Sequence, residues 1–162
     1  MQEALDQALR FLGQRPRSEL EVRRRLARAG VAADTIEATI ERLRALELVD
    51  DRGFATYWVE QRQTFRPRGA RLLKAELRAH GVGADLAGEV AGAVQTPADD
   101  AYRAAEKRAR QLASLDENTF RARLSAHLAR RGFDWDTIGP TVDRLWHEHH
   151  PAANDGEEYQ AR

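Results

Sequence analysis

The sequence predicts an all-α protein built from three tandem three-helix repeats that resemble helix-turn-helix units. Alanine (28), arginine (24) and leucine (17) dominate the 162 residues, whereas valine and isoleucine together number only 11. Strong helix formers therefore prevail, and the β-branched residues that favour strands are scarce. Gly30, Gly81 and Gly132 lie 51 residues apart in similar surroundings. Because so small a unit must bury its apolar face against a neighbour, we expect an elongated, curved array.

The repeat is carried by many positions in one register. Residues 26–31 (Leu-Ala-Arg-Ala-Gly-Val) recur as residues 77–82 (Leu-Arg-Ala-His-Gly-Val) and 128–133 (Leu-Ala-Arg-Arg-Gly-Phe). A constant offset through so many positions is not expected by chance, so we infer three repeats. The same register holds for Val22, Leu73 and Leu124, for Asp34, Asp85 and Asp136, and for Ile36, Ala87 and Ile138.

The helices of the first repeat follow from its capping residues. Ser18 and Glu21 form a capping box that begins a second helix. Gly30 closes this helix because glycine readily adopts the left-handed conformation. Asp34 is expected to cap a third helix. The apolar positions are Leu5, Ala8, Leu9 and Leu12 in the first helix, Val22 and Leu26 in the second, and Ile36, Ile40 and Leu43 in the third.

The other two repeats show the same pattern with less regular first helices. The fifth helix should run from about Gly69 to His80, with Leu73 and Leu77 turned inward. The segment Gln95–Asp99 is expected to be a linker. Apolar positions of the first helices are Phe54, Tyr57, Trp58 and Phe65 in the second repeat and Tyr102, Ala105, Ala109 and Leu112 in the third. The tryptophans, which we expect to pack in cores or between units, are Trp58, Trp135 and Trp146.

These elements divide the chain into repeats at residues 1–47, 48–95 and 98–149. Residues 150–162 lack apolar periodicity, and we expect them to form a disordered tail.

No catalytic motif is present, so we expect a protein that is not an enzyme and needs no cofactor. The sequence lacks a Gly-x-x-x-x-Gly-Lys phosphate loop, a Gly-x-Gly-x-x-Gly fingerprint and a nucleophile elbow. It has no cysteine and no apolar run of the roughly 20 residues that a membrane helix needs. The acidic start, Met1–Asp6, is unlike a signal peptide. We therefore expect a cytoplasmic protein without membrane contact.

Two acidic pairs and one histidine cluster could carry chemistry but have simpler interpretations. Asp50-Asp51 and Asp99-Asp100 stand where helices begin, and we interpret them as caps rather than acid–base dyads. Asp143, His147 and His150 would share one helix face. Histidines also suit the negative end of a helix, so we expect no metal site there.

Basic residues provide the candidate binding surface. The 26 basic and 26 acidic residues cancel, which argues against coating nucleic acid by bulk attraction. Arg71, Lys74 and Arg78 nevertheless fall at i, i+3 and i+7, and would form one stripe on a helix. The forked guanidinium of arginine suits carboxylate or phosphate. The candidate partner-binding residues are Arg23, Arg24, Arg28, Arg66, Arg68, Arg71, Lys74, Arg78, Arg121, Arg123 and Arg130.

The centre of the chain resembles the signature of the RecX regulators. The resemblance rests on residues 49–62 (Val-Asp-Asp-Arg-Gly-Phe-Ala-Thr-Tyr-Trp-Val-Glu-Gln-Arg), which contain the Asp-Asp-x-x-Phe-Ala motif. It extends over about residues 4–148, and the number and order of repeats agree. Further matching residues are Ala8, Leu12, Arg17-Ser18-Glu19 and Leu26, then Gly69, Leu73, Glu76-Leu77 and Gly81-Val82, then Arg131-Gly132-Phe133 and Ile138.

The resemblance implies a bacterial cytoplasmic protein that binds the recombinase RecA in DNA repair, homologous recombination and the SOS response. Members of this family are similar in lodging along the groove of the RecA–single-stranded DNA filament, where they contact more than one protomer. They restrain ATP hydrolysis, strand exchange and co-protease activity, and they limit filament growth. We therefore expect a monomeric, non-catalytic modulator of the filament that makes at most weak contact with single-stranded or duplex DNA.

A second hypothesis is a helix-turn-helix protein that binds DNA directly, such as a transcription regulator. A recognition helix carries asparagine, glutamine or arginine aimed at base edges. The expected helices before residue 118 contain no asparagine and much arginine, which favours contact with protein or phosphate. An adaptor for an unrelated partner is a third hypothesis, because a repeat architecture names no partner.

Overall fold

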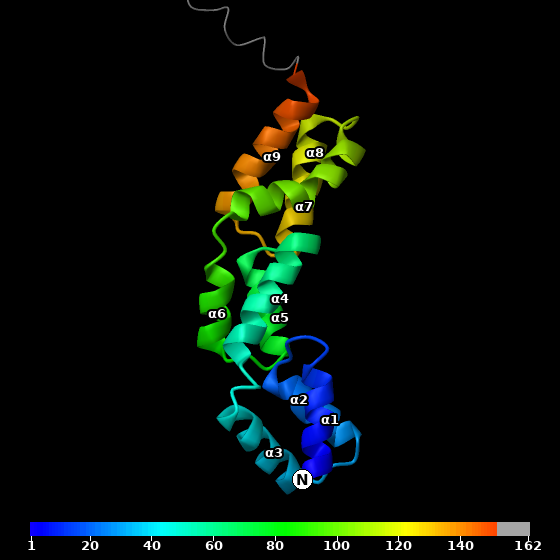
Figure 1. Cartoon of the computed structure of the whole chain (residues 1–162). Helices are drawn as coiled ribbons and strands as arrows, with labels where there is room; N and C mark the ends of the chain where they lie inside the picture. The colour runs from blue at the N-terminus through cyan, green and yellow to red at the C-terminus, as the bar shows by residue number, and fades with distance from the viewer. Residues whose placement is uncertain (152–162) are drawn as a thin grey trace, which may run out of the picture. The chain divides into compact units, whose positions relative to one another are not determined.

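A computed structural model describes residues 1–151 and shows an all-helical chain, with no strand among these residues. The expected fold class of three three-helix repeats is confirmed (Figure 1). The helices are α1 (Gln2–Leu12), α2 (Glu19–Arg28), α3 (Ala33–Ala45), α4 (Asp51–Phe65), α5 (Ala70–Ala79), α6 (Ala84–Gly92), α7 (Pro97–Leu112), α8 (Glu117–Arg130) and α9 (Trp135–His149).

The contacts divide the chain into two compact units. The first unit contains Met1–Gln61 and Lys74–Ala93, and the second contains Arg62–Leu73 and, among the described residues, 94–151. Helices α4 and α5 therefore contribute residues to both units. The elongated arrangement and the repeat boundaries expected from the sequence stay predictions. The expected disordered tail lies outside the described residues from position 152.

Helices α1, α2 and α3 of the first unit pack against one another around an apolar core. The capping box that begins α2 is present: Ser18 Oγ accepts from Glu21 N–H at 3.2 Å, and Glu21 Oε2 accepts from Ser18 N–H at 3.0 Å. Leu9, which was expected in the apolar stripe, is partly exposed. The core consists of Ala4, Ala8, Val22, Leu26, Ile36, Ile40 and Leu43.

Side chains of α4 hold α5 and α6 in the same unit. Trp58 Nε1 donates to Glu76 of α5 at 2.8 Å, and the Trp58 ring lies 4.2 Å from that of His80. Arg52 forms a bidentate ion pair with Glu89 of α6. Leu73 and Leu77 are fully buried, as the spacing on the fifth helix predicts.

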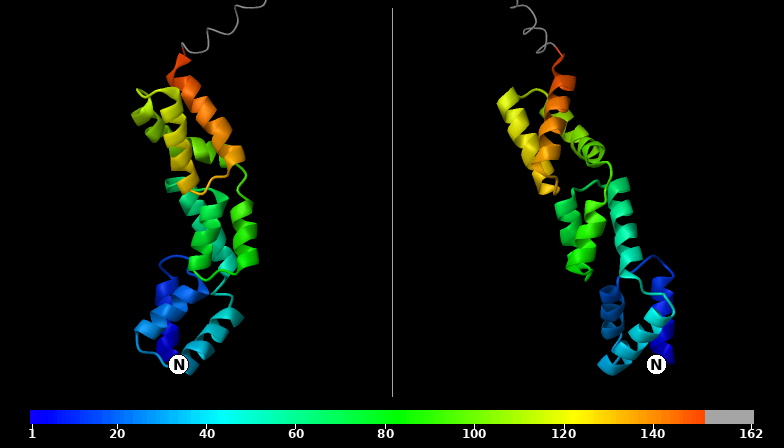
Figure 2. Two further views of the ribbon diagram at one scale, coloured as in Figure 1. Left: turned by 180° about the vertical axis from the view of Figure 1, so that it is seen from behind. Right: turned by 90° about the vertical axis from the view of Figure 1, so that its left-hand side faces the viewer.

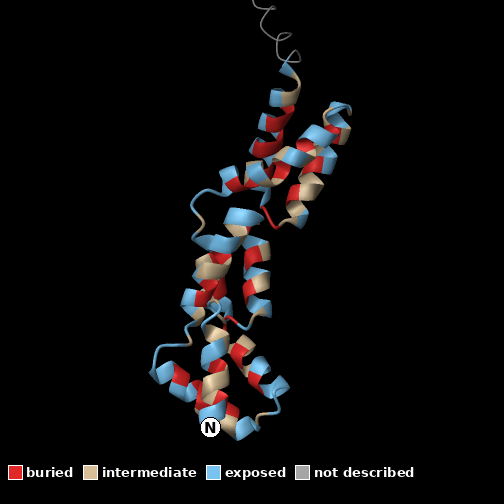
Figure 3. Cartoon of the chain, turned by 45° about the vertical axis from the view of Figure 1, so that its right-hand side comes forward, coloured by how far each residue is buried: buried red, intermediate tan, exposed pale blue. Residues whose placement is uncertain are grey.

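The second unit is built mainly from α7, α8 and α9, which lie side by side (Figures 1 and 2). Buried residues alternate with exposed ones along the helices, as expected for amphipathic helices (Figure 3). The core residues are Ala101, Ala105, Ala109, Leu112, Phe120, Leu124, Leu128, Phe133, Ile138, Val142, Leu145 and Trp146.

The three glycines of the repeat adopt the conformation that the sequence predicts. Gly30, Gly81 and Gly132 have φ of 79°, 87° and 88°, and each follows the second helix of its repeat. Helix α8 begins after an Asp116 cap and has 14 residues, against 10 in α2. Both helices end two residues before their glycine, so the extra turn is at the amino-terminal end of α8. The residues that precede this turn in the third repeat therefore depart from the 51-residue register.

Several sequence-based expectations are wrong in detail. The N-cap of α3 is Ala32, so Asp34 lies within the first turn and does not cap the helix. Helix α7 begins at Pro97, so the second part of the expected linker is helical. Phe65 and Trp135 are 74% and 68% exposed because they end α4 and begin α9, beyond the reach of the cores.

Candidate arginine-rich binding surface

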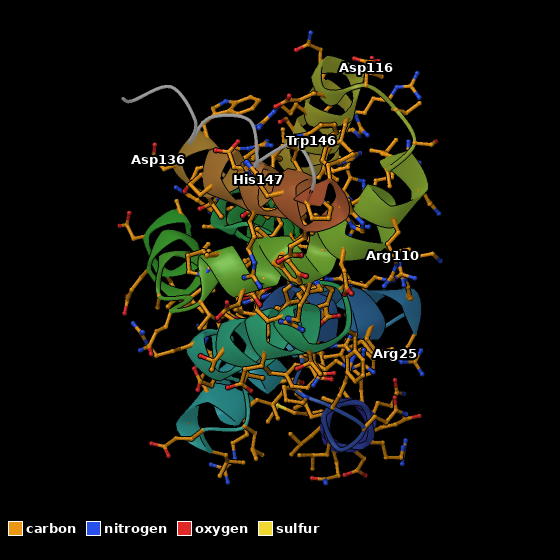
Figure 4. All side chains as sticks on the ribbon, turned by 90° about the horizontal axis from the view of Figure 1, so that it is seen from above. Arg25, Arg110, Asp116, Asp136, Trp146 and His147 are labelled. Atoms are coloured by element: carbon orange, nitrogen blue, oxygen red, sulfur yellow. The ribbon has the colours of Figure 1, made fainter. Side chains whose placement is uncertain are left out.

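The candidate basic residues of α2 differ in how they are engaged. Arg23 is ion-paired with Glu19 and Glu37, and the hydrogen bond to Glu37 raises the pKa of Arg23. Arg24 and Arg28 are exposed and make no ion pair within residues 1–151. Arg25 likewise points away from the ribbon (Figure 4). Helix α2 therefore exposes the charges of Arg24 and Arg28, whereas the charge of Arg23 is neutralised by Glu19 and Glu37.

The stripe expected on α5 is present and exposed. Arg71, Lys74 and Arg78 all reach solvent, while their neighbours Leu73 and Leu77 point into the protein. Two of the three guanidinium or ammonium groups are anchored by backbone: Arg71 donates to Ala129 O at 2.6 Å and Arg78 to Val82 O at 3.2 Å. A carbonyl does not cancel a positive charge, so the stripe stays basic.

A close backbone contact in the second unit brings basic residues of two repeats together. Gly69 N–H donates to Arg131 O at 2.9 Å. A Cβ at Gly69 would overlap the backbone of Gly132 and Phe133, so only glycine lets the two turns approach this closely. The turn before α5 carries Arg66 and Arg68, and the turn before α9 carries Arg131. We call these three arginines the turn cluster.

The turn cluster concentrates like charge. Burial, followed by the nearby charges of Arg68 and Arg66, lowers the pKa of Arg131. Arg66 and Arg131 form no ion pair with any residue in the described part of the chain. Arg71 and Arg130 also lack an acidic partner there. Four arginines of this region therefore have no carboxylate partner among residues 1–151.

A buried polar network fixes the turn that precedes α5. Asp100 is 2% exposed and accepts hydrogen bonds from Gln63 and Arg103. Gln63 Oε1 in turn accepts from Arg68 N–H at 3.1 Å, and Arg103 donates to Gln63 O at 2.8 Å. Asp100 thus anchors the end of α4 and the following turn to α7, which corrects its interpretation as a helix cap.

The candidate residues of α8 are also divided. Arg121 is ion-paired with Glu117 and Asp143, and the hydrogen bond to Asp143 raises the pKa of Arg121. Arg123 and Arg130 are exposed and have no ion-pair partner in residues 1–151. Arg71 donates to the carbonyl of Ala129, so the carboxyl-terminal end of α8 lies against the start of α5.

Sequence reasoning missed three residues of this region. Arg131 was not among the candidates, and Phe65 and Trp135 were expected to be packed. Arg131 could have been suspected from its place beside the closing glycine of the third repeat. No local signal distinguishes Trp135 from a core aromatic, because Ile138 and Val142 follow it at i+3 and i+7. Phe65 could have been recognised as exposed, because Gln61 and Arg62 precede it at i−4 and i−3.

Asp50 and Asp51 each accept a hydrogen bond from the start of a helix, but only Asp50 caps α4 as expected. Asp50 Oδ1 accepts from Arg52 N–H at 2.9 Å and caps α4. Asp51 Oδ1 instead accepts from Glu19 N–H at 2.9 Å and satisfies the start of α2. Burial raises the pKa of Asp51, and the hydrogen bond from Glu19 N–H opposes this effect. Asp51 therefore joins the first repeat to the second.

The histidines near the end of α9 contact backbone oxygens. His147 Nδ1 lies 2.8 Å from Asp143 O, and His150 Nε2 lies 2.8 Å from Ala113 O. The His150 ring stacks on Trp146 at 3.6 Å. Within residues 1–151, no group of three or more histidine, aspartate and glutamate side chains is placed to hold a metal ion.

Two further features of the described residues bear on function. A groove of about 590 Å³ in the first unit is lined by Leu9, Leu12, Leu48 and Phe54, among others. No helix in the part of the chain that the structure describes has the length and apolar character needed to span a membrane.

Comparison with known proteins assigns a family. Models of the first, second and third three-helix domains of RecX match residues 4–43, 50–90 and 98–139. The regulatory protein RecX of Prosthecochloris aestuarii is 38% identical over 88% of this chain and 93% of its own length. The regulatory protein RecX of Mycobacterium tuberculosis is 37% identical over 77% of this chain and 75% of its own length.

A solved structure supports the fold. The crystal structure of RecX from Lactobacillus salivarius superimposes with a TM-score of 0.80 at 21% identity, and the match covers 89% of this chain and 95% of the other. The agreement extends through all three repeats in sequence and through the helical architecture in space. This chain therefore belongs to the RecX family of regulatory proteins.

Proposed function

We propose that this protein is a non-catalytic cytoplasmic modulator that binds the RecA–single-stranded DNA filament as a monomer. In this role it inhibits ATP hydrolysis, strand exchange and filament growth, and so regulates DNA repair and recombination. The observation that carries the proposal is the match of all three repeats, in order, to the RecX family of regulatory proteins.

The charge distribution supports a filament as the partner. Candidate arginines occur on α2 of the first unit and on α5 and α8, so the chain offers several separate basic contacts. Linked contacts to successive copies of one partner raise the overall affinity because later contacts form within the same complex. A polymer such as a recombinase filament supplies those successive copies.

The ion pairs that the arginines already make within the chain indicate which of them are available to a partner. Arg23 and Arg121 are already paired with carboxylates of this chain, and forming a new pair would first break an existing one. Arg24, Arg28 and Arg123 have no such competition in the described residues. We propose that these residues, the α5 stripe and the turn cluster make the partner contacts.

Charge reversal on α5 tests this proposal. The variant carrying Arg71→Glu, Lys74→Glu and Arg78→Glu should bind preformed RecA filaments much more weakly and should lose inhibition of the RecA ATPase. Circular dichroism should show unchanged helicity, because the three side chains are exposed and the two hydrogen bonds lost, from Arg71 and Arg78 to carbonyl oxygens, contribute only about 1 kcal/mol each.

A matched control separates a specific contact from a general loss of charge. Arg10, Arg25 and Arg42 are exposed residues outside the candidate set, and their joint replacement by glutamate changes the net charge equally. This control should inhibit RecA more strongly than the α5 variant. If both variants inhibit as well as the parent protein, neither α5 nor bulk charge mediates the effect. If the parent protein binds filaments without changing ATP hydrolysis, the modulator proposal is wrong.

A further inference from the structure

Two turns that are about 60 residues apart in sequence meet backbone to backbone in the second unit. The hydrogen bond from Gly69 N–H to Arg131 O fixes their separation at 2.9 Å between nitrogen and oxygen. The absence of a side chain at Gly69 permits the contact, and Asp100 with Gln63 anchors the turn on its other side. The turn cluster is thus held in place by buried backbone and side-chain contacts.

The fixed turns hold guanidinium groups together against their mutual repulsion. Arg66 and Arg131 lie close enough for their charges to interact, and neither has a carboxylate partner among residues 1–151. Folded proteins normally distribute such charge or pair it. Exposed guanidinium groups that lie close together and are not paired with a carboxylate form a surface that is complementary to a polyanion.

Exposed aromatic rings lie on the same two chain segments. Phe65 ends α4 one residue before Arg66, and Trp135 begins α9 four residues after Arg131. They are the only strongly exposed large aromatic side chains in the described part of the chain, at 74% and 68%. Other aromatic rings, such as Phe54 and Phe120, are fully buried. An exposed aromatic ring beside basic residues is a platform on which an unpaired base can stack.

We propose that the turn cluster, with Phe65 and Trp135, is a binding site for single-stranded DNA that acts in the protein alone. Arg66 and Arg131 would contact phosphates, and the exposed rings would stack on bases. Single-stranded DNA fits better than a duplex, in which the bases are already stacked, and better than an acidic peptide, which would not need two exposed rings. The inference rests on and deepens the proposed function, because it adds the DNA of the filament as a direct ligand.

Fluorescence anisotropy of a labelled oligothymidylate, titrated with this protein in the absence of RecA, tests the site. The variant with Arg66→Ala and Arg131→Ala should bind at least about tenfold more weakly than the parent. Its dependence of log affinity on log salt should become shallower by about 1.4, because each phosphate contact to a single strand contributes about 0.7. The matched control, with Arg10→Ala and Arg42→Ala, should keep the affinity and salt dependence of the parent.

Substitution of the aromatic rings tests the stacking part separately. Phe65→Ala with Trp135→Ala should weaken binding about tenfold without changing the salt dependence, because stacking involves no counterion release. Oligothymidylate should quench tryptophan fluorescence in the parent. The variant Trp135→Phe should keep the affinity but lose most of the quenching, since Trp146 is buried and Trp58 is partly buried.

The outcomes distinguish this site from the proposed function. Unchanged oligothymidylate binding by the arginine variant, combined with lost inhibition of RecA, would show that the cluster meets RecA and would overturn the inference alone. Equal competition by duplex DNA would also overturn it. Binding as expected without any effect on RecA would sustain the site and reject the modulator. Should Arg131→Ala unfold the protein, Arg66→Ala alone carries the same test, with a salt dependence shallower by about 0.7.

Discussion

Replacing Gly81 by alanine should destabilise the first unit by more than the same change at Gly30. Both glycines close the second helix of a repeat in the left-handed region, with φ of 87° and 79°. They differ in what surrounds them. An added Cβ at Gly30 meets nothing within 4 Å, whereas at Gly81 it would lie 2.6 Å from Leu20 Cβ and 2.8 Å from Leu20 Cδ2.

The magnitude follows from these two terms. A non-glycine residue in the left-handed conformation costs about 1–2 kcal/mol, and this cost applies to both variants. Overpacking in a filled site adds about 1–3 kcal/mol, and only Gly81→Ala incurs it, because Leu20 Cβ is tied to the backbone of α2 and cannot rotate away. Gly81→Ala should therefore lower the free energy of unfolding by about 2–5 kcal/mol.

Urea unfolding followed by far-ultraviolet circular dichroism measures the difference. With a slope of about 2 kcal/mol per molar urea, the midpoint of Gly81→Ala should lie roughly 0.5–1.5 M below that of Gly30→Ala. The difference between the variants isolates the packing of the second repeat against α2, since backbone strain is common to both. Equal midpoints would refute the close contact between Gly81 and Leu20.

Two further predictions concern titration and capping. Burial lowers the pKa of His127, whose Nε2 lies 3.0 Å from Ala104 O. As the pH falls, His127 therefore takes up a proton in the unfolded chain before it does so in the folded protein. The contribution of His127 to the free energy of unfolding should be constant above about pH 6.5 and should decrease below that pH. Urea midpoints across this range should show the loss, and His127→Gln should make them less dependent on pH. Asp51→Ala removes the acceptor for Glu19 N–H and should cost about 0.5–2 kcal/mol. Asp51→Asn, which keeps an oxygen acceptor, should restore most of that stability, and equal destabilisation by both changes would count against a capping role.

The sequence by itself determined the features that depend on neighbours along the chain. The capping box of Ser18 and Glu21 is confirmed because both hydrogen bonds join residues three positions apart. Leu73 and Leu77 are buried because four-residue spacing places both on one face of a helix. The repeat glycines adopt positive φ because a helix that ends in a left-handed residue strongly favours glycine. These local rules were sufficient for the fold class and for the order of the helices.

Local rules were insufficient where two chain segments share a position in space. Asp51 looks like a cap for its own helix, yet its carboxylate serves Glu19, which is 32 residues away. Asp100 has the same local appearance but is buried in a network with Gln63 and Arg103. In each case the aspartate could cap the adjacent helix, but the packing of another segment determines which donors its carboxylate meets.

The candidate binding surface shows the same division. The sequence identified arginine-rich blocks and the exposed stripe on α5, because helical spacing alone sets which side chains share a face. Only the tertiary structure placed Arg131 beside Arg66 and Arg68, through the backbone contact of Gly69 with the turn before α9. It also decided that Trp135 faces solvent, since burial depends on whether another segment covers the helix end. Spacing along a chain fixes which face a side chain occupies, whereas its neighbours across space depend on how distant turns pack.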